Sequence, residues 1–122
     1  MSLRDLHTAG AWVMVFANGA AGLWALGAHW RERLRVRALW WFTAFAEVFI
    51  VVQVALGVAI VAGEDIDPPQ FHLFYGFTAV TVVGIIYSYR PQLAHVRYLL
   101  YGLGGLFLMG LGIRAMVLGG ET

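Results

Sequence analysis

Four long apolar runs, separated by three short polar connections, constrain the fold of this chain more than any other feature. The runs cover residues 6–30, 38–62, 70–89 and 96–118. A helix needs roughly 20 consecutive apolar residues to cross about 30 Å of hydrocarbon, so each run is long enough to span a bilayer. The composition agrees, because 61% of the residues are hydrophobic and only 12% are charged, too few for the surface of a small soluble domain. The sequence predicts one all-α domain, residues 1–122, with four transmembrane helices.

The three connections predict how these helices are arranged. Short connections make consecutive helices antiparallel neighbours, so we expect an up-down-up-down four-helix bundle. The first and third connections are rich in arginine, and short loops of this kind stay on the cytoplasmic side. The second connection, AGEDIDPPQ, is acidic and has no basic residue. We therefore expect a multi-pass protein of a prokaryotic cell membrane, with both termini outside and the first helix retained, since it lacks a small-residue cleavage site.

Charge and cysteine content exclude several classes of function. The net charge is only +1, and all eight basic residues are arginines near the predicted membrane boundaries, so nucleic-acid binding has no electrostatic support. The chain has no cysteine, which excludes disulfides, thiolate metal sites and covalent haem attachment. Histidine is left as the main candidate ligand.

Two histidines occupy matching positions in the predicted bundle. His7 lies at the outer start of the first helix and His72 at the outer start of the third. Alternate helices of a four-helix bundle lie diagonally opposite, so these side chains can face each other as the axial ligands of a haem iron. Gly10 and Gly76 follow within about one turn and are expected to leave clearance for the flat macrocycle. The pattern fits one haem b near the outer face, and it fits equally two interfacial histidines bonded to water or headgroups.

Other charged residues and histidines lie near the two membrane boundaries. Arg114 and Arg4 are at the depth of the candidate haem and are expected to contact its propionates. For Arg114 an ion pair with the acidic second connection, or a position at the lipid surface, is the alternative. His29 and His95 lie at the inner boundary, where they could hold a second haem, although the surrounding arginines favour a hydrated loop around His95.

One carboxylate, Glu47, lies near the predicted centre of the bilayer. A carboxylate at this depth is costly unless it is protonated or paired. A structural hydrogen bond to Asn18 of the first helix is one interpretation, and a proton relay is the other. A proton-coupled carrier that uses Glu47 is therefore an alternative function for the chain.

The fourth apolar run is rich in glycine. Small residues allow helix backbones to approach closely in lipid and usually mark a helix–helix contact, which could lie within the bundle or with a partner. A haem-free accessory or assembly subunit, packed on a larger membrane complex, is therefore a second alternative. The glycines are Gly102, Gly104, Gly105, Gly110 and Gly112.

The segment QVALGVAIVAGEDIDPPQFHLFYGF, residues 53–77, resembles a stretch found in each half of heme A synthase. There, a Gln-Val-x-Leu-Gly helix end, a short external loop and a histidine that opens the next helix recur. The order of helices and loops is also similar. In that family each half is a four-helix bundle whose haem is held by histidines of the first and third helices. The resemblance therefore implies His7 and His72 as haem ligands.

The chain also departs from that family. It corresponds to a single half, so a two-half arrangement would require a homodimer. Arg4 and Thr8 stand where the family has the glutamate and arginine near its first catalytic histidine, and the second connection has no cysteine pair. The resemblance therefore implies haem binding without a complete heme A synthase, and we assign no catalytic residue. The expected role is electron transfer with a quinone or a respiratory complex, or haem handling during assembly of respiratory oxidases.

Overall fold

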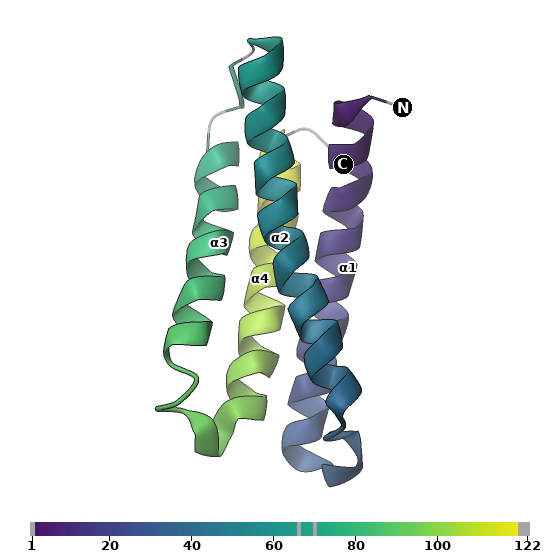
Figure 1. The fold of residues 1–122 in the computed structure, drawn as a ribbon, viewed down its shortest axis with the longest axis vertical. Coiled ribbons are helices and arrows are strands. Elements are labelled where there is room, and N and C mark those ends of the chain that lie inside the picture. The colour runs from purple at the N-terminus through teal and green to yellow at the C-terminus, as the bar shows by residue number, and fades with distance from the viewer. Residues whose placement is uncertain (1, 66, 70, 120–122) are drawn as a thin grey trace.

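A computed structural model describes residues 2–65, 67–69 and 71–119. Within these ranges the chain forms four α-helices, two short 3₁₀ helices and no strand (Figure 1). The all-α fold is therefore confirmed, and the predicted helix boundaries fall within three residues of those observed. The elements are α1 (Leu3–Trp30), η1 (Glu32–Leu34), α2 (Arg37–Glu64), α3 (His72–Ser88), η2 (Ala94–Val96) and α4 (Arg97–Gly119).

Three of the described helical segments are long and apolar enough to cross a membrane. They are α1 and α2, with 28 residues each, and the 26-residue segment Ala94–Gly119. The fourth helix, α3, has only 17 residues, or about 26 Å at 1.5 Å per residue, which is the lower limit for a spanning helix. It begins at His72, whose backbone N–H donates to the Pro69 carbonyl at 3.1 Å. The predicted start, Gln70, lies outside the described residues.

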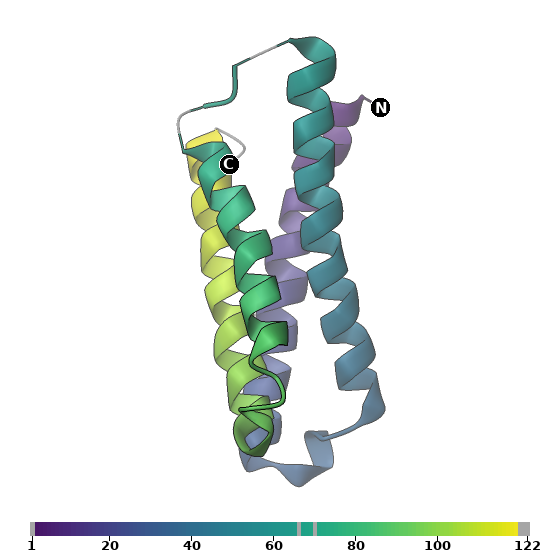
Figure 2. The same cartoon turned by 60° about the vertical axis from the view of Figure 1, so that its left-hand side comes forward.

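Consecutive helices run antiparallel, as the two views in Figures 1 and 2 show. Helix α1 packs against α2 and most extensively against α4, while α3 packs against α4 and less extensively against α2. Helices α1 and α3 therefore occupy opposite corners of the bundle. We call the end that contains His7 and His72 the histidine end, and the other, with connections 31–36 and 89–96, the arginine end.

Local sequence explains where α1 begins and ends. The Ser2 hydroxyl accepts from the Asp5 backbone N–H at 3.1 Å, and the Asp5 carboxylate accepts from the Ser2 N–H at 3.1 Å. This capping box satisfies two helix-start donors that would otherwise lack partners. At the other end, the Arg35 guanidinium donates to the carbonyls of Ala28 at 2.7 Å and His29 at 3.0 Å. One arginine of the first connection thus caps the last turn of α1.

Backbone contact between α1 and α4 explains the glycines in the fourth run. A Cβ added to Gly105 would lie 2.7 Å from the Cα of Gly22, and a Cβ added to Gly102 would lie 2.8 Å from the backbone nitrogen of Leu26. Only glycine allows two helices to touch at this distance. Gly102 and Gly105 therefore form a contact inside the bundle, whereas no atom lies within 4 Å of a Cβ added to Gly110.

Candidate functional site

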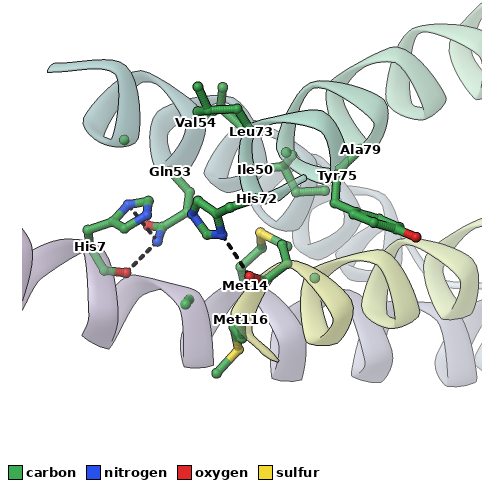
Figure 3. A pocket seen from close by; sticks show the side chains of 15 residues that line it. His7, Met14, Ile50, Gln53, Val54, His72, Leu73, Tyr75, Ala79 and Met116 are labelled. Carbon is green, nitrogen blue, oxygen red and sulfur yellow. Dashed lines mark hydrogen bonds between the residues drawn. The ribbon is translucent and has the colours of Figure 1, made fainter. Parts of the chain in front are cut away.

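A cavity opens at the histidine end, where all four helices contribute to its lining (Figure 3). Its empty volume, which counts the open mouth and the solvent space beyond it, is about 550 Å³. Aliphatic side chains such as Ile50 and Val54 form much of the lining, and the imidazole and amide groups come from His7, His72 and Gln53. The cavity is therefore mainly apolar, with a few imidazole and amide nitrogen atoms at one end.

The structure brings His7 of α1 and His72 of α3 together in this cavity. Their ring centroids are 6.1 Å apart, and the ring planes are nearly perpendicular, at 80°. The two rings come from opposite corners of the bundle, so the arrangement depends on the rotation of both helices as well as on the depth of each residue.

His72 has a fixed hydrogen-bond role. Its Nδ1 lies 2.7 Å from the carbonyl oxygen of Ala115 in α4. Because a carbonyl only accepts, Nδ1 carries the proton, and the neutral ring keeps its lone pair on Nε2. Metal-binding histidines almost always bond their second ring nitrogen to a carboxylate, a backbone carbonyl or water, and the Ala115 carbonyl is a partner of this kind.

His7 is bonded differently. The Nε2 atom of Gln53 lies 3.0 Å from His7 Nδ1 and also donates to the His7 carbonyl oxygen (Figure 3). An amide nitrogen only donates, so Nδ1 accepts, and the neutral ring carries its proton on Nε2. The two facing histidines therefore have opposite tautomers in this structure.

Two glycines, Gly10 and Gly76, were expected to leave clearance beside the histidines, and only one of them does. Gly76 lines the cavity, as predicted, and an added Cβ there would meet Val54 at an ordinary 3.6 Å. Gly10 does not line the cavity; an added Cβ would instead collide with the side-chain oxygen of Gln53. The predicted role of Gly10 in macrocycle clearance is therefore wrong, because the glycine makes room for Gln53.

The two arginines predicted near the propionates are exposed, and neither lines the cavity. Arg4 lies in the first turn of α1, and Arg114 immediately precedes Ala115, whose carbonyl bonds to His72. Both are at the histidine end, and their contact with propionates stays a prediction.

The inner histidines do not form a comparable pair. The His29 ring contacts Trp30 edge to face, with centroids 4.9 Å apart, whereas His95 is exposed in η2. No ring contact joins the two in the part of the chain that the structure describes. The second haem site remains an untested expectation with no geometry in its favour.

Asn18 and Glu47 also differ from the expectation. The Asn18 amide, 1% exposed, donates to the Met14 carbonyl at 2.9 Å and to the Ala46 carbonyl of α2 at 3.2 Å. The hydrogen bond expected between Asn18 and Glu47 is therefore replaced by a bond to the α2 backbone, one residue before Glu47. Glu47 itself is half-buried.

The sequence identified Gln53 only as a polar residue inside a span and gave neither Gln53 nor Gly57 a role at the site. Gly57 lines the cavity, and an added Cβ there would lie 3.2 Å from His7 Cε1. The signal was present, because residues four apart share one helix face and both residues belong to the QVALG segment. Only the structure shows that this face of α2 is turned toward His7.

No known protein family, curated protein or solved structure matches this chain. The chemistry of the site is therefore interpreted from its own residues.

Proposed function

We propose that this chain is a membrane haem b protein in which His7 and His72 bind the iron of one haem. The supporting observation is the 6.1 Å between their ring centroids inside an apolar cavity. Two imidazoles bonded at about 2.0–2.1 Å to opposite sides of one metal ion have centroids roughly 6 Å apart. The observed separation of the ring centroids is therefore compatible with a pair of axial ligands.

The donor set fits a haem better than a bare metal ion. Two imidazoles leave a tetrahedral ion short of ligands, whereas a porphyrin supplies four nitrogens and needs two axial ligands. Gly57, Gly76 and Gly112 line the cavity. A Cβ added to Gly76 would make only an ordinary contact, whereas Gly57 and Gly112 make room for the side chains of His7 and Met14. The Ala115 carbonyl would hold the His72 ring in place.

A bound haem would supply reversible transfer of one electron, and the proposed role of the protein follows from this. Electron exchange with a quinone or a respiratory complex in a prokaryotic cell membrane is the first form of the proposal. Handling of haem during assembly of respiratory oxidases is the second, and the resemblance to half of heme A synthase supports it. In both forms a partner is needed, as a homodimer or within a larger complex.

An absorption spectrum tests the proposal directly. Protein purified from membranes, and again after titration with haemin, should give a sharp α-band on reduction. His7→Ala and His72→Ala should each abolish this six-coordinate signal, because each removes one axial ligand. His29→Ala is the matched control, since that ring lies at the arginine end against Trp30, and its spectrum should equal that of the original chain. A chain that gives no α-band under either condition, or keeps it in both ligand variants, would refute the proposal.

A further inference from the structure

We propose that Gln53 is a positioning residue that sets the tautomer of His7 and turns its amide over when His7 binds a metal. This inference rests on the proposed function and adds to it a residue that controls one of the two ligands. Gln53 belongs to α2, is 5% exposed, and reaches His7 across the α1–α2 contact.

The observed hydrogen bonds conflict with ligation by His7. Gln53 Nε2 donates toward His7 Nδ1 at 3.0 Å, so the proton of the neutral ring is on Nε2. A ligating Nε2 must offer its lone pair, which moves the proton to Nδ1 and requires an acceptor beside it. The amide end that now faces Nδ1 is a donor and cannot fill that role.

The oxygen end of the same amide can act as this acceptor. Gln53 Oε1 is buried and has no hydrogen-bond partner among the described residues, which is a costly state for an amide oxygen. Turning the amide over would place this oxygen beside His7 Nδ1 as the required acceptor. Gly10 lies against the amide and, having no side chain, leaves room for the exchange.

The present orientation is held by a second bond. Gln53 Nε2 also donates to the His7 carbonyl oxygen. Turning the amide over gives up that bond and directs Oε1 toward the same carbonyl oxygen, so the amide must also move away from it. The orientation therefore depends on whether His7 Nε2 carries a proton or binds a metal. His72 has no such freedom, because its partner is the Ala115 backbone carbonyl, which can only accept. The tautomer of His72 is therefore fixed, whereas that of His7 can change.

The haem-free protein provides the first test. Nitrogen-15 NMR of histidine-labelled protein, with the His7 signals assigned by their loss in His7→Ala, should show the Nε2–H tautomer in the original chain. Gln53→Glu should convert His7 to the Nδ1–H tautomer at alkaline pH, where the carboxylate only accepts. Gln53→Met, of similar size, should leave a mixture. Val52→Met, at a neighbouring position that is 45% exposed, is the control and should leave the original tautomer.

The haem-loaded protein provides the second test. Removing a hydrogen-bond partner of a ligating histidine typically weakens metal binding by about 10- to 100-fold, so Gln53→Met should bind haemin weaker by that factor. Gln53→Glu should restore the affinity and lower the midpoint potential below that of the original chain, because a carboxylate strengthens the donor character of His7. A purely structural role for Gln53 predicts no such shift in potential.

The outcomes separate this inference from the proposed function. If the original chain binds no haem, the proposed function fails, while the NMR experiment still decides the tautomer of His7. If haem binds but Gln53→Met and Gln53→Glu both keep the original tautomer, affinity and potential, the role of Gln53 is refuted and the haem site stands.

Discussion

Replacing Gly105 by alanine tests whether backbone contact between α1 and α4 holds the bundle together. The added Cβ would lie 2.7 Å from the Cα of Gly22, whereas non-bonded carbons prefer about 3.5–4.0 Å. The helices must separate by close to 1 Å, and overpacking of this kind typically costs about 1–3 kcal/mol. Alanine also gains up to about 1 kcal/mol over glycine in helix propensity, which would partly hide the loss.

Gly110→Ala removes this ambiguity, because it makes the same exchange in the same helix. No atom lies within 4 Å of a Cβ added to Gly110, so only the propensity gain applies. The difference in free energy of unfolding between Gly105→Ala and Gly110→Ala should therefore be about 1–3 kcal/mol. Reversible unfolding of the purified protein in mixed micelles, followed by helical circular dichroism, measures it. Equal unfolding energies for the two variants would show that the α1–α4 contact yields without cost and that the reasoning is wrong.

Three further substitutions test contacts seen in the structure. Asn18→Leu removes the amide bond to the Ala46 carbonyl and should lower the free energy of unfolding by about 0.6 kcal/mol, the average for such bonds in membranes, and by no more than about 1.7 kcal/mol. An unchanged value in the same unfolding assay would contradict this contribution. Gly57→Ala places a Cβ 3.2 Å from the His7 ring, so haemin titration should show weaker binding while the haem-free fold is kept. Gly76→Ala, whose Cβ meets its neighbour at 3.6 Å, should leave the haem-free fold unchanged as well, and unfolding of either glycine variant would contradict the assigned clearances.

The sequence predicted the helices well because their positions depend on properties that act locally. An apolar run of spanning length must satisfy its backbone internally, so it forms a helix wherever the run begins and ends. The depth of His7 and His72 followed from the same boundaries, since each lies near the start of its helix. Their diagonal placement followed from the short connections.

Hydrogen-bond partners could not be predicted in this way. Gln53 and Asn18 were both recognisable as polar residues inside a span, but an amide can bond to a side chain or to any nearby carbonyl. The choice depends on the rotation of each helix, which packing of the whole bundle sets. Thus Asn18 bonds to the Ala46 carbonyl and not to Glu47, and Gly10 faces Gln53 and not the cavity.

The distance between the two histidines is controlled by the most extensive helix contact in the bundle. His7 belongs to α1, whereas the His72 ring is bonded to α4 through the Ala115 carbonyl. Any change in the spacing of α1 and α4 therefore changes the distance between the rings, even though His72 belongs to α3. The contact around Gly105, ten residues or about 15 Å along α4 from Ala115, brings those two backbones together. The glycines at the α1–α4 contact therefore do more than allow the helices to pack. They also help to set the distance between the two histidines.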